Sequence, residues 1–330
     1  MSRATLSAVV PNYNHGHVLE SSLRAILAQS RAADEVLVVD DGSTDNSIEV
    51  IEKICRDNSA VRLIRSDRNY GLPAALNRGL KEAKGEYICF PAADRWVLPG
   101  YFETSMSMLE KHPQAGLSCG TTAWLDKLGG ELRQAARSNM MEPAYLDPLQ
   151  AATLERSRHF LISDGAVIVK KSALQEIGGF DPVLRWSGCW FAYIAIGFRY
   201  GLCYLPDPPV VACERDRNSY SGVGARDREA SRQVVARVVE CLRSPAFADV
   251  APLFRDTGIL SVLSGRTLFL TDRQARRLVN FAGLGLIFRK EAGRVVREYI
   301  PFLAPLIEAY RNRFESKRLQ AAAPFTNSCD

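Results

Sequence analysis

Acidic residues follow two short apolar runs in the first hundred positions. The sequence Asp-Asp-Gly-Ser at 40–43 follows the run 35–39, and Asp94 follows the run 86–90. A carboxylate at the end of a strand can accept a hydrogen bond from a nucleotide base or a ribose hydroxyl. It can also hold a divalent cation on a diphosphate, since Mg²⁺ is typically bound by one or two carboxylates plus substrate phosphates. The alternative in both places is a capped turn, because Asp, Gly and Ser are common turn residues.

Several other chemistries lack their sequence signature. No Gly-x-Gly-x-x-Gly follows the first apolar run and no P-loop is present, which argues against a dinucleotide or Walker-type site. The four His do not stand at zinc-ligand spacings, which argues against a structural zinc. The eight Cys are scattered, mostly in apolar segments, and predict reduced thiols in a cytoplasmic protein.

Apolar residues in the first 125 positions alternate between short continuous runs and helical spacing. This alternation predicts an α/β fold whose mostly parallel sheet is covered by helices on both faces. Ligands of such sheets bind beyond the carboxyl ends of the strands, so we expect the site at the loops 11–14, 40–43 and 91–94. The expected strands are 6–10, 35–39, 61–64 and 86–90, and the expected helices are 18–27, 48–54 and 72–83.

The rest of the sequence contains fewer strand signals. Everything after about residue 227 has helical character. We therefore predict an α/β domain at 1–225 and a helical C-terminal extension with a basic tail at 226–330. The expected elements after residue 125 are a helix that starts at Pro148 behind the cap Asp147, strands at 167–169 and 202–205, and a helix at 190–200.

Basic residues concentrate near the C-terminus. The net charge of +5 is too small to indicate a nucleic-acid partner, but residues 271–320 hold eleven Lys and Arg against five Asp and Glu. Apolar residues alternate with these cations, so the tail can lie on an anionic membrane surface. The alternative is packing against the main domain or a partner. With neither a signal peptide nor a run of about 18 apolar residues, we expect a cytoplasmic protein, with any membrane contact peripheral at the inner face.

Five segments occur in an order that is highly specific. They are 9–14 (Val-Val-Pro-Asn-Tyr-Asn), 27–30 (Leu-Ala-Gln-Ser), 35–45, 69–79 and 85–88. In this order the chain resembles the family 2 glycosyltransferases of the GT-A fold. The resemblance implies a Rossmann-like, mostly parallel sheet flanked by helices. It also implies an enzyme that takes a sugar from a nucleotide diphosphate and inverts the anomeric centre.

The resemblance assigns roles to the loops after three strands. It implies that Asp41 holds the nucleotide base and that Pro11, Asn12 and Tyr13 line the nucleotide. It implies that Asp94 contacts the nucleotide through a divalent cation, Mn²⁺ or Mg²⁺. The donor would be a nucleotide-diphosphate sugar, with a UDP-sugar as the first choice. The acceptor would be a saccharide, a lipid-linked acceptor or another hydroxyl.

The chain departs from the family pattern at the metal motif. The family usually carries Asp-Ala-Asp-Asp, whereas residues 92–95 are Ala-Ala-Asp-Arg. The loss of two carboxylates is expected to weaken a site for a hard cation. Arg95 can pair with a phosphate instead, because a guanidinium fork matches phosphate oxygens. The alternative for Arg95 is a solvated charge on a loop.

A second departure concerns the general base. The family usually carries a Glu-Asp pair after Gly-Gly-Phe-Asp, and by register Cys189 falls where the base Asp would be. An ordinary thiol has a pKa of about 8.5 and is mostly protonated at neutral pH, so it is a poor base. Asp164, Asp181 and Glu214 are other acids in the region, with Asp181 favoured as a turn residue. The catalytic base therefore stays unassigned.

Aromatic and basic residues nearby have two interpretations each. Trp186 and Trp190 can stack on sugar faces, although aromatic residues that enter a helix are more often core residues. The segment 215–228, which contains Arg and Gly, can close over a diphosphate or serve as a solvated linker.

The resemblance implies an inverting hexosyltransferase that works in cell-surface polysaccharide or glycan synthesis. The alternative is a catalytically impaired GT-A protein that acts as a nucleotide/sugar-binding or assembly module, because the usual acids are missing at 92, 95 and 188–189. A nucleotidyltransferase is disfavoured, since the Gly-rich, basic N-terminal loop expected there is absent.

Overall fold

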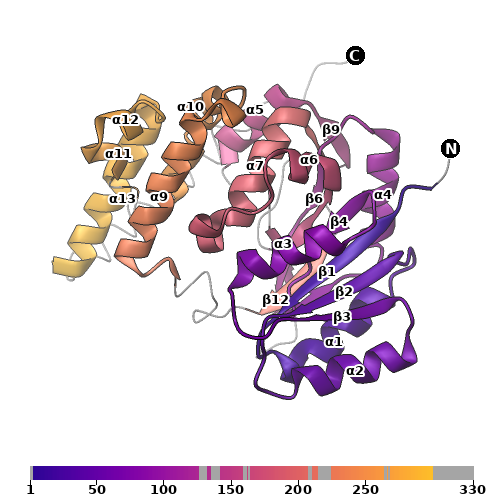
Figure 1. Ribbon diagram of the computed structural model, residues 1–330. Coiled ribbons are helices and arrows are strands. Elements are labelled where there is room, and N and C mark those ends of the chain that lie inside the picture. Colours follow the sequence, from indigo (N-terminus) through magenta and orange to yellow (C-terminus); the bar gives the residue numbers. More distant parts are fainter. Residues whose placement is uncertain are drawn as a thin grey trace, which may run out of the picture.

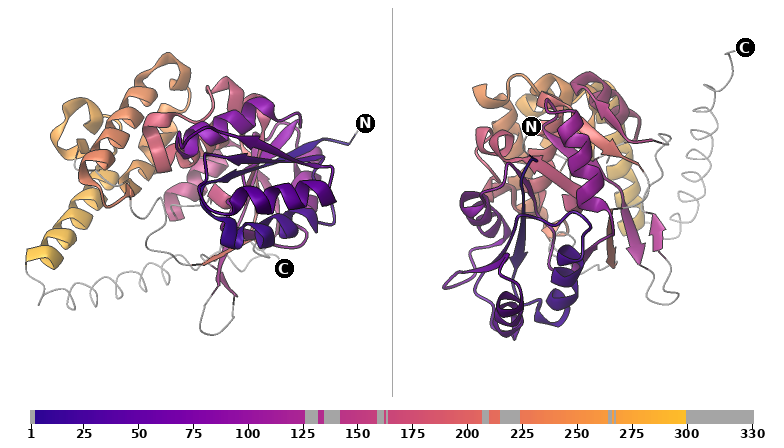
Figure 2. Two further views of the ribbon diagram at one scale, coloured as in Figure 1. Left: turned by 60° about the horizontal axis from the view of Figure 1, so that its bottom comes forward. Right: turned by 90° about the vertical axis from the view of Figure 1, so that its right-hand side faces the viewer.

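The structure, a computed structural model, describes most of the first 299 residues (Figure 1). The described part has a mixed α/β arrangement in which one large sheet has helices on both faces (Figure 2). This confirms the predicted fold class. The described residues are 3–125, 132–134, 142–158, 162, 164–206, 210–214, 224–263, 266 and 268–299.

The large sheet has the strand order β3-β2-β1-β4-β10-β6-β11-β9. β1 to β4 form parallel pairs, as predicted, and so do β6 and β11. β10 runs antiparallel to both β4 and β6, and β9 runs antiparallel to β11, which the apolar runs did not indicate. The strands are β1 (Leu6–Asn12), β2 (Glu35–Asp40), β3 (Val61–Arg65), β4 (Tyr87–Cys89), β6 (Leu117–Gly120), β9 (Ala144–Leu146), β10 (Val167–Lys170) and β11 (Leu202–Leu205).

Both faces of the sheet are covered because its central strands are apolar on both sides. Val9 of β1 packs into the cluster that includes α3 and α7, whereas Ala8 and Val10 pack into the cluster that includes α1, α2 and α4. At Gly79 in α3 an added Cβ would stand 2.2 Å from Val9 Cγ1, so the glycine lets this helix approach the sheet. The covering helices are α1 (Gly16–Leu27), α2 (Ser47–Asp57), α3 (Leu72–Glu82), α4 (Tyr101–Lys111), α6 (Lys171–Glu176) and α7 (Gly188–Tyr200).

The strands and helices predicted in the first 125 residues are all present, with small shifts at their ends. α1 begins at Gly16, ahead of the predicted start, and β4 ends at Cys89, one residue early. The helix predicted after Asp147 is α5 (Pro148–Arg158). The Asp147 carboxylate accepts hydrogen bonds from two backbone N–H groups of the first turn, at 2.8 and 2.9 Å, which is the expected cap.

A smaller sheet continues the chain just past the carboxyl ends of β4, β6 and β11, and the sequence did not predict it. Its strand order is β5-β12-β7-β8. β12 runs parallel to β7 and antiparallel to β5, and its pairing with β5 joins segments that are more than 100 residues apart in the sequence. The strands are β5 (Arg95–Val97), β7 (Thr122–Leu125), β8 (Leu132–Gln134) and β12 (Val211–Glu214).

The described chain after residue 227 is helical, as predicted, and packs beside α7 (Figure 1). Phe254 of α10 is fully buried and its ring contacts Trp190, Phe191 and Phe198 of α7. These helices therefore share a core with the α/β part, and a domain boundary at 225 stays a prediction. The main C-terminal helices are α9 (Arg228–Arg243), α10 (Ala251–Thr257), α11 (Leu268–Thr271), α12 (Arg273–Arg276) and α13 (Phe281–Tyr299).

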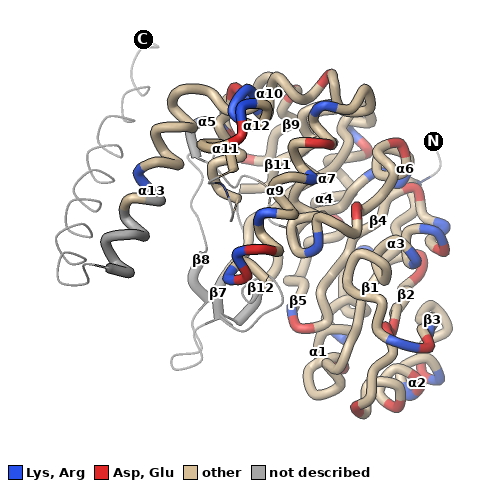
Figure 3. Tube along the Cα trace, turned by 60° about the vertical axis from the view of Figure 1, so that its left-hand side comes forward, with Lys and Arg blue, Asp and Glu red and all other residues tan. Residues whose placement is uncertain are grey.

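α13 buries one side and exposes another. Ile287 is fully buried, whereas Phe281 and Phe288 are 94% and 67% exposed. Figure 3 shows Lys and Arg residues at α12 and α13. The rest of the predicted basic tail, 300–330, lies outside the described residues. Among the helices that the structure describes, none combines the length and the hydrophobicity needed to cross a bilayer.

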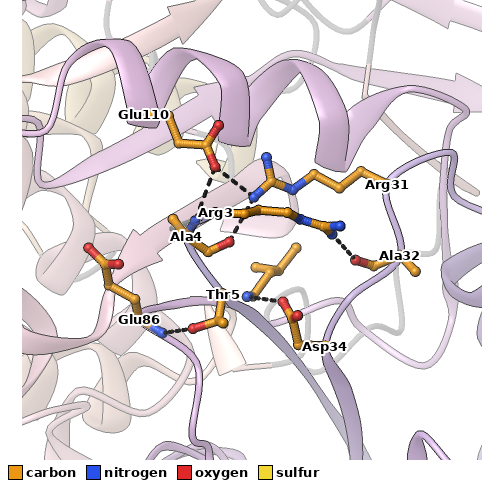
Figure 4. Close-up of polar contacts among 9 residues, drawn as sticks. Arg3, Ala4, Thr5, Arg31, Ala32, Asp34, Glu86 and Glu110 are labelled. Carbon is orange, nitrogen blue, oxygen red and sulfur yellow. Dashed lines mark hydrogen bonds and ion pairs between the residues drawn. The ribbon is translucent and has the colours of Figure 1, made fainter. Parts of the chain in front are cut away.

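Polar contacts hold the amino end of β1 (Figure 4). Arg31 donates to the carbonyl of Ala4 at 2.7 Å and to Glu110 Oε1 at 2.9 Å, and the N–H of Leu6 donates to Asp34 Oδ2 at 2.7 Å. The Arg31 hydrogen bond lowers the pKa of Glu110, and partial burial opposes that shift. With its amino end held in this way, β1 presents the loop at its other end in a defined position.

Candidate functional site

A pocket of about 440 Å³ opens at the carboxyl ends of β1, β2 and β4. Its volume lies in the range of small-molecule and cofactor sites. It also stands where open α/β sheets bind their ligands. The pocket-lining residues that the sequence analysis assigned to nucleotide, metal or base are Pro11, Asn12, Tyr13, Asp41, Asp94 and Cys189.

The two acids at the end of β2 have different surroundings, and the first is structural. Asp40 is 1% exposed and accepts hydrogen bonds from Ser43 N at 2.9 Å, Ser43 Oγ at 2.6 Å and Asn12 Nδ2 at 2.8 Å. Asp40 therefore joins the turn after β2 to the end of β1. Gly42 in this turn has a φ of 78°, and an added Cβ would stand 2.6 Å from the Arg68 backbone, so the turn requires glycine.

Asp41 lines the pocket, and among the described residues only one of its carboxylate oxygens has a hydrogen-bond partner. Oδ2 accepts hydrogen bonds from the backbone N–H groups of Tyr70 at 3.0 Å and Gly71 at 2.7 Å. The residue is 4% exposed, and Oδ1 is buried with no hydrogen-bond partner among the described residues. A buried acceptor without a donor is energetically costly. Oδ1 is therefore suited to accept an N–H or O–H group from a ligand.

Two further polar atoms at this end of the pocket are also buried without a hydrogen-bond partner among the described residues. Asn12 Oδ1 and His15 Nδ1 are buried without a hydrogen-bond partner in the described part of the chain. The amide of Asn12 is fixed, because its Nδ2 donates to Asp40 Oδ2 at 2.8 Å and to Ser43 Oγ at 3.2 Å. Tyr13 lines the pocket and is 40% exposed. This end of the pocket thus offers fixed acceptors beside an accessible aromatic ring.

The segment after β4 brings one acid and one cation to the pocket. Asp94 is exposed and Arg95 is half-buried, and both line the pocket. Ser22 of α1 holds the backbone of this segment, since its Oγ donates to the carbonyls of Arg95 at 2.8 Å and Ala92 at 3.3 Å. The segment is therefore positioned by α1 as well as by the pairing of β5 with β12.

The metal-ligating side chains near Asp94 determine what kind of cation the pocket could hold. No cluster of three or more His, Cys, Asp or Glu suited to a metal occurs in the part of the chain that the structure describes. A cation such as Mg²⁺ can be bound by a single carboxylate when phosphate oxygens and water fill its other positions. The single carboxylate of Asp94 therefore fits a cation only where phosphate oxygens and water would fill its other positions.

The start of α7 forms another wall of the pocket. Cys189 in its first turn is half-buried and lines the pocket, as does Trp186 just before the helix. Trp190 is 7% exposed and packs against Phe254 in the shared core. Of the two tryptophans, Trp190 is thus a core residue and Trp186 a pocket residue.

The backbone just before Trp186 has an unusual conformation. Arg185 has a φ of 47°, which is uncommon for a non-glycine residue.

Asp181, the acid favoured as a turn residue, has structural contacts. Its Oδ1 accepts a hydrogen bond from the Val183 N–H at 2.8 Å, and its Oδ2 pairs with Arg237 Nε of α9 at 2.6 Å. Arg237 also pairs with Glu240 at 2.7 Å, and its hydrogen bonds to Glu240 and Asp181 raise its pKa further above an already basic value. Asp181 therefore links the turn before α7 to α9.

The other two acids lie on backbone that flanks the Asp94 segment. Asp164 begins the 3₁₀ turn before β10 and is followed by Gly165, which lines the pocket. Glu214 ends β12, one residue past the position that pairs with Arg95 of β5. The backbones at 164 and 214 thus approach the same segment. The sequence did not indicate this because it depends on strand pairings between distant segments.

Several pocket residues were not predicted. The start of α3 contributes Gly71, whose φ of 90° directs its N–H to Asp41 Oδ2. The available signal was the Asn-x-Gly turn ahead of a helix, since helix starts carry unpaired N–H groups. Of the segment 215–228, residues 215–223 lie outside the described part. The unpredicted pocket residues include His15, Asn69, Gly71, Gly165 and Tyr193.

Comparison with known families identifies this chain. The profile of Glycosyl transferase family 2 matches residues 7–178, which is more than half of the sequence. The chain belongs to glycosyl transferase family 2. This confirms the resemblance carried by the segments between 9–14 and 85–88.

A relative from Escherichia coli agrees with this family 2 assignment. The uncharacterized glycosyltransferase YibD of Escherichia coli K12 is 37% identical over 103 residues, which are 31% of this chain and 30% of YibD. The match therefore spans less than a third of that relative.

Solved structures support the fold. A crystal structure of S. aureus TarS residues 1–349 with UDP-GlcNAc has a TM-score of 0.62, with 18% identity over 89% of this chain and 81% of that chain. The mannosyltransferase PcManGT of Pyrobaculum calidifontis, solved with GDP-Man and Mn²⁺, has a TM-score of 0.53, with 19% identity over 98% of this chain and 89% of that chain. At these identities the likeness shows the fold alone, and that fold is GT-A.

Proposed function

We propose that this family 2 member is an inverting glycosyltransferase whose donor is a nucleotide-diphosphate sugar, with a UDP-sugar as the first choice. Asp41 carries the proposal, because Oδ1 is buried in the pocket with no partner among the described residues while Oδ2 is held by two backbone N–H groups. Uracil and guanine both have a ring N–H that such a carboxylate oxygen can accept in a charge-assisted hydrogen bond. The TarS structure with UDP-GlcNAc supports this class of donor.

The remaining acceptors suit the rest of the nucleoside. Pro11, Asn12 and Tyr13 would line it, with Asn12 Oδ1 accepting a hydrogen bond from the base or a ribose hydroxyl. Asp94 lines the same pocket from the loop after β4. In this proposal the nucleoside lies over the ends of β1 and β2, and the diphosphate extends toward Asp94.

Asp94 is the proposed protein ligand of a divalent cation, Mn²⁺ or Mg²⁺, that also binds the diphosphate. When bound, such a cation neutralises charge that develops on the leaving diphosphate. PcManGT, solved with GDP-Man and Mn²⁺, supports this choice. Since Ala92 and Arg95 stand where the family usually has carboxylates, we expect little cation binding in the absence of nucleotide.

Inversion requires the acceptor hydroxyl to attack the anomeric carbon from the face opposite the diphosphate, while a base takes its proton. Cys189 lines the pocket at the position usual for that base, but an ordinary thiol is a weak base at neutral pH. We therefore propose Asp164 or Glu214, whose backbones flank the Asp94 segment. Of Asp164→Asn and Glu214→Gln, the variant that removes the base should lose turnover and keep nucleotide binding.

One observation favours a second candidate, a catalytically impaired GT-A protein that binds a nucleotide sugar or serves in assembly. Cys189 stands in the pocket where an acid is usual. Under this candidate the chain binds UDP but releases none from a UDP-sugar with any acceptor. A Cys189→Asp variant that gains donor hydrolysis would support position 189 as the base position. If the variant binds nucleotide but gains no donor hydrolysis, position 189 is not the position of the base.

We propose an acceptor from polysaccharide or glycan synthesis, namely a saccharide, a lipid-linked acceptor or another hydroxyl, used at the cytoplasmic face of the membrane. Phe281 and Phe288 are exposed on α13 beside the exposed Arg289. Residues 271–299 contain seven Lys and Arg and three Asp and Glu. Such a surface suits peripheral contact with anionic lipid.

Vesicle sedimentation tests this contact. The chain should sediment with phosphatidylglycerol vesicles and not with phosphatidylcholine vesicles, and a Phe281→Ser, Phe288→Ser double variant should lose that binding. Equal sedimentation of the double variant and the wild type would contradict the proposed surface.

The function itself is tested in two stages with the purified chain. Calorimetric titration with UDP and GDP, with and without Mn²⁺, measures nucleotide binding, which should be strongly reduced in Asp41→Asn. Release of nucleoside diphosphate from UDP- and GDP-sugars across an acceptor panel then separates the enzyme from the impaired protein. The absence of any nucleotide binding would contradict both the donor class and the site.

A further inference from the structure

Arg95 combines a fixed backbone with a side chain that has no partner among the described residues. Its N–H donates to the carbonyl of Ala92 at 3.2 Å, its carbonyl accepts from Ser22 Oγ at 2.8 Å, and its strand is paired with β12. The guanidinium has no hydrogen bond or ion pair with any residue in the described part of the chain. It lines the same pocket as Asp41 and Asp94. A positioned guanidinium in the wall of a ligand pocket, with no partner in the part of the chain that the structure describes, is available to bind a ligand.

Gly165 provides the space that the guanidinium occupies. A Cβ at Gly165 would stand 2.7 Å from Arg95 Nη1, 3.4 Å from its Cδ and 3.6 Å from its Cζ, and the first of these distances is too short for a real side chain. Gly165 also lines the pocket. The guanidinium therefore packs against the pocket wall at the turn before β10.

Charge balance indicates what ligand group Arg95 would take. Residues 92–95 are Ala-Ala-Asp-Arg, so this segment presents one carboxylate and one guanidinium. A diphosphate brings more than one negative charge, and a cation held by a single carboxylate is weakly bound by the protein. A guanidinium can donate two parallel hydrogen bonds to the oxygens of a phosphate group. A phosphate of the donor is therefore the ligand group that suits Arg95.

We propose that Arg95 binds the diphosphate of the sugar donor directly and shares the neutralisation of the leaving group with the cation at Asp94. This inference rests on the proposed function. During transfer the bond between the anomeric carbon and the β-phosphate oxygen breaks, and the diphosphate keeps the bonding electron pair. The acceptor oxygen forms the new bond, and its proton goes to the base. Arg95 stays protonated throughout and donates hydrogen bonds to the oxygens that gain charge.

The consequence is that nucleoside diphosphate binding persists without a divalent cation. The experiment is a calorimetric titration of wild type and Arg95→Gln with uridine and with UDP, in the presence of EDTA. In the wild type UDP should bind more tightly than uridine. Arg95→Gln should weaken UDP binding about 10- to 100-fold, the range for loss of hydrogen bonds to a charged group, and change uridine binding less than about twofold.

Two further variants sharpen the test. Arg95→Lys keeps the charge and loses the fork, so its Kd for UDP should lie between those of wild type and Arg95→Gln. Arg24→Gln removes the same charge from an exposed site on α1, where the side chain is 69% exposed, and should leave UDP binding unchanged. Because the Arg95 side chain makes no protein hydrogen bond among the described residues, Arg95→Gln should unfold at the wild-type temperature.

The outcomes separate this inference from the proposed function. If uridine and UDP bind equally in EDTA, or if Arg95→Gln leaves the Kd for UDP within about twofold, the role of Arg95 is overturned while the nucleoside site stands. If UDP binds only with Mn²⁺, Arg95 does not bind the diphosphate on its own and the inference again fails. If neither uridine nor UDP nor their guanine counterparts bind under any condition, the proposed function fails with it.

Discussion

Asp41→Asn is expected to weaken nucleotide binding while keeping the fold. Asn retains one oxygen that can accept the hydrogen bonds now donated by the N–H groups of Tyr70 and Gly71 at 3.0 and 2.7 Å. Its NH₂ group then takes the place of Oδ1, which is buried in the pocket without a partner among the described residues. A donor cannot pair with the N–H of a base. Losing one hydrogen bond to a charged group costs about 1.5–3 kcal/mol, or about 10- to 100-fold in Kd.

The assay is calorimetric titration with UDP, together with urea unfolding of each variant. Asp40 offers a matched control, since it is also buried but its carboxylate accepts hydrogen bonds from Ser43 and Asn12. Asp40→Asn should lower stability by about 1–3 kcal/mol, because a charged acceptor of three donors is lost. Asp40→Asn should raise the Kd for UDP less than Asp41→Asn does. If Asp40→Asn weakened UDP binding more than Asp41→Asn, Asp41 would not be the residue that holds the base.

Three further outcomes follow from the contacts described above. Phe254→Ala should lower the free energy of unfolding by about 3–5 kcal/mol in urea titrations, because the buried ring joins α10 to α7; a loss below about 1 kcal/mol would mean that these helices do not share the core. The Arg31 hydrogen bond holds the pKa of Glu110 below its ordinary value of 4.5, so its contribution to stability is complete above that pH and is lost as the pH falls through the lowered pKa. Urea midpoints of Glu110→Gln should therefore fall less steeply than those of the wild type below pH 4.5, and parallel curves would contradict the pairing. Proton NMR of the product made from an α-linked UDP-sugar should show a β linkage, whereas an α linkage would contradict inversion.

The parts of the fold with a strong local pattern could be predicted from the sequence. β1 and β2 are continuous apolar runs, because they are buried on both faces, and α1 and α3 show helical spacing. The convergence of their following loops could be predicted too, since parallel strands place their carboxyl ends at one edge. The direction of β10 could not, because an apolar run of four residues looks the same in a parallel or an antiparallel pair.

The sequence could predict the site residues that act through their side-chain type. It could not predict those whose place depends on backbone N–H groups or on the pairing of distant strands. The resemblance singled out Asp41, whereas the residues alone do not distinguish it from Asp40, and the difference lies in which donors each one meets. Those donors at Asp41 are backbone N–H groups, which leave little trace in the sequence. The backbone at Glu214 lies next to the Asp94 segment only because the short strands β5 and β12 pair. Strands of three and four residues are too short to show a recognisable period in the sequence.

A crystal structure of this chain grown with UDP would show whether Asp41 holds the nucleotide base. We expect UDP in the pocket at the ends of β1, β2 and β4, with the uracil ring nitrogen about 2.7–3.2 Å from Asp41 Oδ1. We expect the diphosphate beside Asp94 and Arg95. A nucleotide bound elsewhere, or in this pocket with its base directed away from Asp41, would rule out this site.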